Sequence, residues 1–438
     1  MNNSLWLSTL KQSLYRHLTK RSRSHRNRRS LQNAGSVPAF VSRTSGETLE
    51  DRTLLTTFTV TNTEINGAGS LYAAIEAANG SEGADTITFE ASLIDQTLMI
   101  YNELVITDDV TIIGLGAEHL TLSGDGTRRL FRIDDGDAEN SISVELSGFT
   151  LTNGFANYTS GGAIHSLETL SVSDVTFVDN QAGVLNDGPV YGGSFGGAIY
   201  SAGDLTVTNS TFVRNSADWY GGAIYSTGGL LSVTGCDFTE NQTFYSGGAI
   251  LVQDGDLHVS SSTFSENHSD TLGGGIYVRN GVLTVDDTVF TENSSGTGGG
   301  IYHFNSTALT PVFTELSITD CTFQGNTTTS NGGAVSFRSD VSLYSSYYTA
   351  FIENSYFLEN DASSGGALAS TGTNILVSGS TFVKNTARLY GGGISDTSRN
   401  LTVQNSLFDQ NSADAWGGPS IPTGNWFCKT ARFPVIPH

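Results

Sequence analysis

Residues Gly221–Asn241 read GGAIYSTGGLLSVTGCDFTEN and contain three short segments, AIYS, LLSV and CDFT. Each segment is too short for a helix and is bounded by Gly, Asn or Asp, which favour turns. Within the segments the apolar residues recur with a period of two, as in a β-strand, and not 3.6, as in a helix. This stretch therefore predicts three short strands separated by tight turns.

The same unit recurs along the chain. A Gly-Gly pair followed by a small and an aliphatic residue begins at Gly161, Gly196, Gly221, Gly247, Gly273, Gly298, Gly332, Gly365 and Gly391, with a broken copy at Gly417. A second motif, Phe-x-x-Asn, places Phe at 177, 212, 238, 264, 290, 323, 357, 382 and 408, and Asn three residues after each. Three strands in about 25 residues, repeated in phase, predict one coil of a single-stranded parallel β-helix. A propeller blade needs about 40 residues and four strands, and fits less well.

Equivalent residues of stacked coils lie one strand spacing apart, about 4.8 Å. We therefore expect the Phe column to fill the interior. The Asn column is expected at a corner, where the amides hydrogen-bond to one another and Asn tolerates a left-handed backbone. The Gly pair allows a tight turn against the neighbouring coil.

A column of mostly small residues precedes the Phe column by two positions, so it is expected to face the interior as well. It contains Cys236 and Cys321, which are three coils apart. Three strand spacings are about 14 Å, too far for a disulfide. Both cysteines are therefore predicted to be buried and unpaired, and Cys428 is the third cysteine of the chain.

The chain divides by composition into four parts. Residues 1–55 are a basic, largely disordered arm, interpreted either as an export segment or as a solvated arm, because no apolar stretch of a standard cleavable signal follows the basic run. Residues 56–84 are expected to cap the solenoid with a short helix, Leu71–Ala78, begun by Ser70 and closed by Asn79-Gly80. Residues 85–418 form the solenoid. Residues 419–438 hold four of the seven prolines and break the repeat, so we expect an atypical tail, either truncated or frameshifted or a short natural end.

Charge separates the arm from the body. Residues 53–438 hold 11 of the 21 basic and 40 of the 43 acidic residues, a net charge of −29. A body this acidic repels phosphates, which argues against nucleic-acid binding. A transmembrane helix needs about 20 consecutive apolar residues. The sequence contains no such run, so no transmembrane helix is predicted.

The paired Gly-Gly-Ala-Ile and Phe-x-x-Asn motifs resemble the repeat of the chlamydial polymorphic outer membrane proteins over about residues 149–418. The resemblance implies a right-handed parallel β-helix of the pectin-lyase type that acts in surface adhesion. Near the N-terminus, Leu49–Leu55 (LEDRTLL) resembles a motif of large secreted planctomycete-type proteins. Together these imply a secreted protein or one at the bacterial cell surface or outer membrane, whose partners are cell-surface glycans or proteins of a host or neighbouring cell.

Enzymatic activity is the alternative, since the pectin-lyase fold also hosts polysaccharide lyases and hydrolases. A lyase needs a cationic base beside carboxylates, and a hydrolase needs carboxylates on neighbouring coils. Asp286 and Asp287 are adjacent on a strand and point to opposite faces. We therefore predict no catalytic residues, no metal site and no cofactor. The interpretation is a non-catalytic, adhesin-like or structural protein, with a polysaccharide-active enzyme or carbohydrate-binding module as the alternative.

One column is a candidate ligand site. The residue after the motif aliphatic is aromatic in several coils, and alternation along a strand turns it outward if the aliphatic is inside. Such a ladder can bind sugar rings or a partner, or simply stabilise the coil. A second set lies before the glycines at Trp219-Tyr220, Phe244-Tyr245, Tyr390 and Trp416. The predicted outward ladder consists of Tyr200, Tyr225, Tyr277 and Tyr302.

Overall fold

The computed structural model describes residues 55–137, 139, 141–184, 193–306, 316–340, 349–372, 374–397, 400–414, 426–428 and 431–434. For residue 349 and the residues after 425, only the backbone is described. All of these residues belong to one compact unit, Thr53–His438. The predicted arm lies outside the described residues except for Leu55, and so do Trp416 and the side chain of Cys428.

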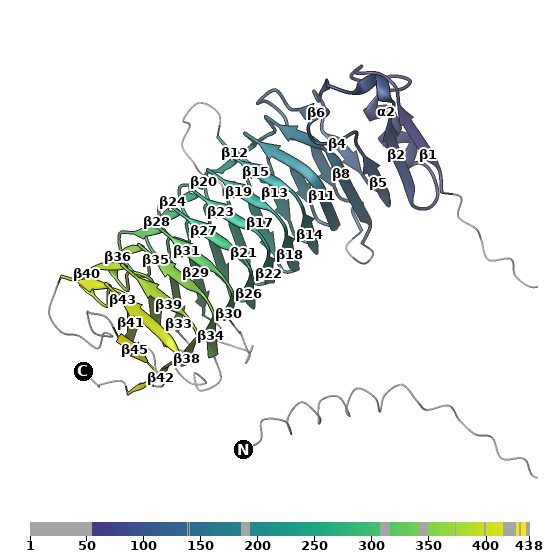
Figure 1. The fold of residues 1–438 in the computed structure, drawn as a ribbon. Coiled ribbons are helices and arrows are strands. Elements are labelled where there is room, and N and C mark those ends of the chain that lie inside the picture. Colours follow the sequence, from purple (N-terminus) through teal and green to yellow (C-terminus); the bar gives the residue numbers. More distant parts are fainter. Residues whose placement is uncertain are drawn as a thin grey trace, which may run out of the picture. The chain divides into compact units, whose positions relative to one another are not determined.

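Three sheets run along the described part of the chain (Figure 1), with 25 strands in sheet A, 11 in sheet B and 10 in sheet C. Sheet B consists of β4 (Leu104–Ile106), β7 (Phe131–Ile133), β10 (Ile164–Ser166), β13 (Ile199–Ser201), β17 (Ile224–Thr227), β21 (Ile250–Gln253), β25 (Ile276–Arg279), β29 (Ile301–Asn305), β33 (Val335–Ser339), β37 (Leu368–Thr371) and β41 (Ile394–Thr397). Sheet C consists of β9 (Phe155–Asn157), β12 (Gln181–Gly183), β16 (Ser216–Ala217), β20 (Gln242–Thr243), β24 (His268–Ser269), β28 (Ser294–Ser295), β32 (Thr327–Thr328), β36 (Asp361–Ser364), β40 (Thr386–Tyr390) and β44 (Ser412–Ala413).

Sheet A takes two strands from each regular coil. Its members are β1 (Thr57–Val60), β2 (Asp85–Phe89), β3 (Gln96–Met99), β5 (Val110–Ile113), β6 (Leu120–Ser123), β8 (Ser143–Thr152), β11 (Thr169–Val178), β14 (Leu205–Thr208), β15 (Thr211–Val213), β18 (Leu230–Thr234), β19 (Asp237–Thr239), β22 (Asp256–Ser260), β23 (Thr263–Ser265), β26 (Leu283–Asp286), β27 (Val289–Thr291), β30 (Leu316–Thr319), β31 (Thr322–Gln324), β34 (Thr349–Glu353), β35 (Tyr356–Leu358), β38 (Asn374–Ser378), β39 (Thr381–Val383), β42 (Asn400–Gln404), β43 (Ser406–Asp409), β45 (Trp426–Cys428) and β46 (Ala431–Pro434).

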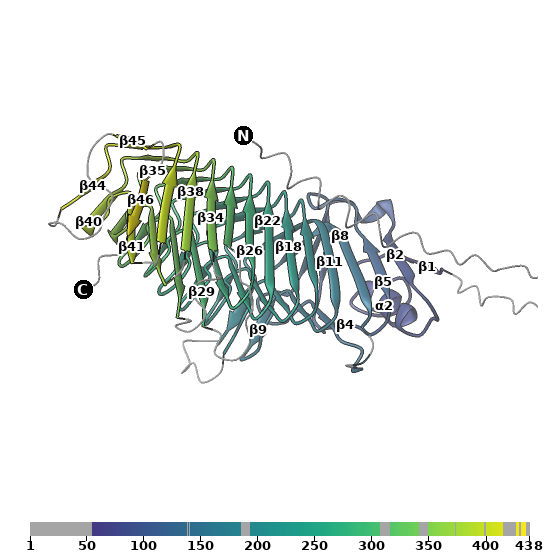
Figure 2. The ribbon, with the colours of Figure 1, turned by 90° about the horizontal axis from the view of Figure 1, so that it is seen from below.

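Each coil passes from sheet B to sheet A to sheet C and then returns to sheet B one layer further on. Neighbouring coils pair in parallel and in register, so that identical motif positions meet, as in the pairs Ile224–Ile250, Phe238–Phe264 and Gln242–His268. Figure 2 shows β18, β22 and β26 of sheet A following one another in this way. The predicted parallel β-helix is therefore confirmed.

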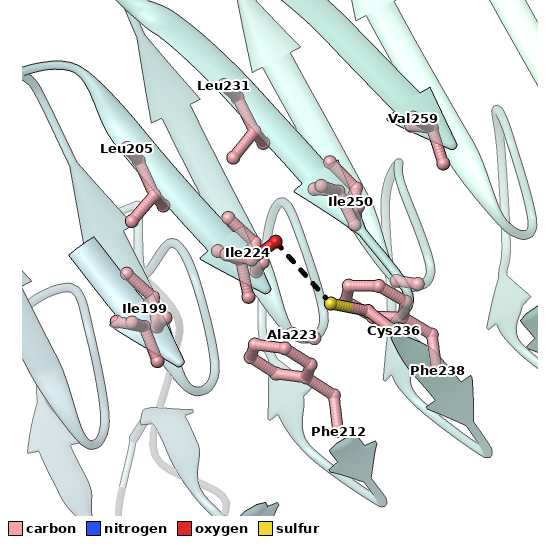
Figure 3. Close-up of a cluster of buried hydrophobic side chains, with 14 of the residues drawn as sticks. Ile199, Leu205, Phe212, Ala223, Ile224, Leu231, Cys236, Phe238, Ile250 and Val259 are labelled. Atoms are coloured by element: carbon pink, nitrogen blue, oxygen red, sulfur yellow. Dashed lines mark hydrogen bonds between the residues drawn. The ribbon is translucent and has the colours of Figure 1, made fainter. Parts of the chain in front are cut away.

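The interior is filled by side chains from sheets A and B. Ile199, Ile224 and Ile250 project from sheet B toward Leu205 and Leu231 of sheet A (Figure 3), and all five are fully buried. The nine Phe of the repeat motif are at most 1% exposed. Their rings stack along the axis with centroids 4.6–5.0 Å apart and planes within 8° of parallel. The predicted Phe column is confirmed.

The Asn column forms a continuous hydrogen-bonded ladder. The backbone N–H and the side-chain amide of Asn215 both donate to Oδ1 of Asn241, at 3.0 Å each. The amide also donates to the backbone carbonyl of Phe177, at 3.1 Å. The left-handed backbone, however, lies one residue before the expected position, for example at Glu240 with φ +55°. The Asn side chains serve hydrogen bonding, and the residue before each one makes the corner.

The small-residue column is interior, as predicted, and it forms a second ladder. In most of its coils the backbone N–H donates to the hydroxyl of the next coil, as from Cys236 to Ser262 at 3.1 Å and from Cys321 to Ser355 at 3.2 Å. Both cysteines are buried and free, as expected. Burial raises the pKa of Cys236 to about 11 and that of Cys321 to about 12.

The glycine pair is needed for the close approach of coils. Gly221 has φ +65°, which side-chain-bearing residues rarely adopt. A Cβ on Gly222 would collide with the backbone carbonyl oxygen of Gly248 in the next coil. The motif is thus a steric requirement of the stack.

The first described coil carries the predicted helix. Helix α2 (Leu71–Asn79) begins after Ser70, whose hydroxyl accepts the N–H of Ala73 at 3.2 Å, and its stripe Leu71, Ala74, Ile75 and Ala78 packs onto the core. A short 3-10 helix, η1 (Ala91–Leu93), follows β2. Beyond residue 418, β45 and β46 pair antiparallel with β43 and β42, the only antiparallel pairings among the described strands.

Candidate functional site

The tyrosine column lies on the outer side of sheet B. Ile224 and Ile276 are fully buried in the interior, so alternation turns Tyr225 and Tyr277 to the opposite face. Tyr200 stacks on Tyr225 with ring centroids 5.5 Å apart, and Tyr277 meets Tyr302 at 5.3 Å. Leu251 lies between these two pairs in register. The ladder is therefore present, interrupted once, with the predicted strand phase.

This outward-facing column is covered by other side chains. Tyr225 is 6% exposed, and Tyr277 and Tyr302 are each 7% exposed, whereas Tyr200 is half-buried. Phe195, Tyr220 and Leu272, each of which directly precedes a Gly-Gly pair, pack on the ladder. The covering residues are linked by single parallel bridges from coil to coil.

Burial also sets the chemistry of the tyrosine hydroxyls. It raises the pKa of Tyr225 to about 12 and raises that of Tyr277 further. The Tyr225 hydroxyl donates to Oε1 of Gln253 at 3.3 Å. The tyrosines are buried although the isoleucines beside them also lie in the core, so their burial does not mean a shifted strand phase. The ladder forms a second apolar layer outside sheet B.

Other histidine and acidic side chains of the described part of the chain are dispersed. His303 is buried, and its Nε2–H donates to the Gly281 carbonyl at 2.9 Å. Burial lowers its pKa. Asp134 pairs with Arg132 at 3.1 Å. Within the described ranges, no three His, Cys, Asp or Glu side chains are grouped to hold a metal ion. No helix in this part of the chain is long and apolar enough to cross a membrane.

A groove that the sequence did not predict lies on the outer face of sheet C, over β12, β16, β20 and β24. Strands β12, β20 and β24 follow one another along one side in Figure 1. The groove has a volume of about 310 Å³ and is open on one side. It is lined by Gln181, Ser216, Ala217, Asp218, Gln242, Thr243, Phe244, His268 and Asp270.

Two outward rows supply the functional groups of this sheet C groove. The first row follows the Asn ladder directly and places Gln181, Ser216, Gln242 and His268 in register. The second row lies two residues further on in each coil and contains Gly183, Asp218, Phe244 and Asp270. The hydrogen bonds of the Asn ladder fix the backbone beneath both rows, so the groove is built on a rigid floor.

Within the groove His268 is held from two sides. One ring nitrogen lies 2.8 Å from the Ser294 hydroxyl, and Nε2 donates to the Asp270 carboxylate at 3.0 Å. Asp218 lies against Gly183, where an added Cβ would be 2.8 Å from Oδ1 of Asp218. Burial raises the pKa of Asp218.

Aromatic side chains flank the same groove. Phe244 is 64% exposed and forms part of the lining. Beside it, Tyr245 packs against Trp219 with ring centroids 5.1 Å apart. Of the second aromatic set, Tyr220 covers the tyrosine ladder, and Phe244 and Tyr245 remain exposed. In the sequence, the groove could have been found from the residues that lie one and three positions after each motif Asn.

Two family models match the chain. Residues 190–347 match the right-handed beta helix region, and residues 174–202 match the Chlamydia polymorphic membrane protein repeat. The expected right-handed helix and the resemblance to this repeat are confirmed. No curated protein sequence matches the chain significantly.

Solved structures similar to the chain include three with different functions. The A-module of the mannuronan C-5 epimerase AlgE6 of Azotobacter vinelandii is 13% identical, with a TM-score of 0.43, covering 77% of this chain and 94% of its own. The catalytic unit of a GH87 alpha-1,3-glucanase of Streptomyces thermodiastaticus is 15% identical, with a TM-score of 0.40, and the match covers 86% of this chain and 71% of the glucanase chain. PfbA, a surface adhesin of Streptococcus pneumoniae, is 13% identical, with a TM-score of 0.37, and the match covers 84% of this chain and 91% of the PfbA chain.

Proposed function

We propose that the protein is a secreted or cell-surface β-helix that acts as a non-catalytic, adhesin-like or structural surface protein of a bacterium. The observation that carries this proposal is the stacked Phe column, whose buried rings touch along the axis at 4.6–5.0 Å. Stacked side chains fill the interior of the coils, so a ligand contacts the outward-facing side chains. These side chains differ from coil to coil on a constant backbone.

The partners that fit this surface are cell-surface glycans or proteins of a host or neighbouring cell. The body carries a net charge of −29, which disfavours polyanionic partners such as nucleic acids. The tyrosine ladder has a structural role in this proposal, because its rings are covered by Phe195, Tyr220 and Leu272. The open sheet C groove is the better candidate for contact with a ligand.

The location and the attachment are tested together. Intact cells that produce the protein are treated with a protease that cannot enter them, and its loss from the cells is followed by immunoblotting. Purified full chain, labelled with a fluorophore, is then offered to candidate host or neighbouring cells. We expect protease-sensitive surface protein and saturable attachment. Protein that stays protected inside the cells, or that attaches to none of them, contradicts the proposal.

A polysaccharide-active enzyme or carbohydrate-binding module on the same fold is the second candidate. The observation that favours it is the groove, where Asp218 has a raised pKa and Asp270 holds His268 at 3.0 Å. An enzyme would release new reducing ends or unsaturated products from a polymer such as polygalacturonate or alginate. A binding module would retain the polymer unchanged.

A further inference from the structure

We propose that the sheet C groove is a binding site for a neutral, hydroxyl-rich glycan chain. The inference rests on the proposed function and deepens it by naming the ligand class and the site. It is carried by the juxtaposition, on one rigid face, of planar hydrogen-bonding groups and an exposed aromatic ring.

The shape of the groove suits a short stretch of polymer. Its volume of about 310 Å³ lies at the lower end of the roughly 300–1,000 Å³ usual for ligand sites. It extends over four consecutive coils, and the strands beneath it are only two or three residues long. A polymer can therefore enter and leave across the open side.

The polar groups match the hydroxyls of a sugar. The side-chain amides of Gln181 and Gln242 can each donate and accept a hydrogen bond, and the carboxylates of Asp218 and Asp270 can accept from the hydroxyls of a sugar. His268 is fixed between Ser294 and Asp270, so little side-chain freedom is lost when a ligand binds.

The aromatic group matches the apolar face of a sugar ring. Phe244 is 64% exposed, although the repeat buries every Phe of the Phe-x-x-Asn motif. It lies between Asp218 and Asp270 in the second outward row, one coil from each. Ring C–H groups of a sugar carry partial positive charge and pack against the negative face of an aromatic ring. A sugar on Phe244 thus has carboxylates on both sides.

Charge selects a neutral chain over a uronate polymer. The described lining contains two carboxylates and neither Lys nor Arg. Bringing an anionic polymer against Asp218 and Asp270 would be repulsive in a site partly shielded from water. Burial raises the pKa of Asp218, and groups with such shifted pKa values gather at active and binding sites.

The test measures binding of the full chain to immobilised or soluble polysaccharides. The neutral probes are dextran, a soluble β-1,3-glucan and galactomannan, and the anionic probes are alginate and polygalacturonate. The groove variants are Phe244→Ala and Asp218→Asn. The matched controls are Tyr356→Ala, an exposed aromatic on sheet A, and Asp361→Asn, in the first outward row of sheet C but outside the groove. Circular dichroism and thermal melting check that each variant is folded.

We expect saturable binding to at least one neutral probe and weaker binding to the anionic ones. Phe244→Ala should weaken binding by about 2- to 10-fold, the value of one aromatic stack. Asp218→Asn should weaken it by about tenfold, the value of a hydrogen bond to a charged group. Both controls should bind like the wild type.

Three outcomes would overturn the inference: no neutral probe binds, the anionic probes bind better, or the folded groove variants bind like the wild type. The cell-attachment assay separates these results from the proposed function. If Phe244→Ala attaches to cells like the wild type, the groove assignment fails while the surface function stands. If the wild type binds a neutral glycan through the groove but attaches to no cell, the groove assignment stands and the adhesin function fails.

Discussion

Asn215 donates two hydrogen bonds, from its backbone N–H and its side-chain amide, to the single Oδ1 atom of Asn241 in the next coil, each at 3.0 Å. Asn241 repeats the arrangement with Asn267. Both partners are fully buried, so water cannot replace a lost bond. In the ladder, the Asn of one coil therefore hydrogen-bonds to the next coil through a single side-chain oxygen.

Replacing Asn241 by Ala should break this ladder at one rung. The two donors of Asn215 would be left buried without an acceptor, so we expect a loss of about 2–4 kcal/mol in the free energy of unfolding. Urea denaturation measures it. Asn400→Ala, which removes an exposed Asn of β42, is the control and should change stability by less than about 0.5 kcal/mol. Equal effects of the two substitutions would contradict the role given to the ladder.

Phe264 lies between Phe238 and Phe290, with ring centroids 4.7 and 4.8 Å away, and is fully buried. Phe264→Ala should therefore lower the free energy of unfolding by about 3–5 kcal/mol through the cavity it leaves. Phe244→Ala, at an exposed Phe, should cost far less. Denaturation of both variants compares an interior Phe with a surface Phe, and a cost of under 1 kcal/mol for Phe264→Ala would contradict the Phe column.

The tyrosine ladder is expected to be structural. Replacing Tyr225 and Tyr277 by Ser removes two rings from the apolar layer over sheet B, at about 3 kcal/mol each, the low end for truncating a large aromatic. The double variant should melt at a lower temperature and, while folded, attach to cells or glycans like the wild type. Loss of attachment with an unchanged melting temperature would instead identify the column as a binding platform.

His303 should make stability depend on pH. Burial lowers its pKa below the ordinary value of 6.5, so the unfolded chain takes up a proton more readily than the folded one as the pH falls. Its contribution is complete above about pH 6.5 and is lost at lower pH. His303→Gln, which keeps a side-chain donor near the Gly281 carbonyl, should show a smaller fall in stability between pH 7.5 and pH 5. The same fall in both proteins would show that His303 is protonated while folded.

The interior could be predicted from the sequence because its residues repeat in identity as well as in position. Phe264 and Asn241 each belong to a column of one residue type, and stacking identical coils brings such residues together. The left-handed corner was placed one residue late because it is occupied by varied residues, such as Glu240 and Arg214, which carry no conformational signature.

The outer surface was harder to predict for the same reason. Asp218, Phe244 and Asp270 occupy equivalent positions, but their chemistry differs from coil to coil, so no repeat marks them. The tyrosines were assigned to the correct face. Their burial depends on the path of the residues before three of the Gly-Gly pairs, Phe195, Tyr220 and Leu272, which pack on the tyrosines. The period of the strands does not fix this path.

The central claim is that the protein binds a surface ligand and does not catalyse a reaction on it. It is tested most directly by measuring binding and turnover in one experiment. The full chain is incubated with dextran, a soluble β-1,3-glucan, galactomannan, alginate and polygalacturonate, with and without Ca²⁺. Retained polymer and newly formed reducing or unsaturated ends are followed over time. We predict saturable retention of a neutral polymer with no new ends. Steady formation of new ends that is abolished by Asp218→Asn or Asp270→Asn would contradict the account and identify an enzyme.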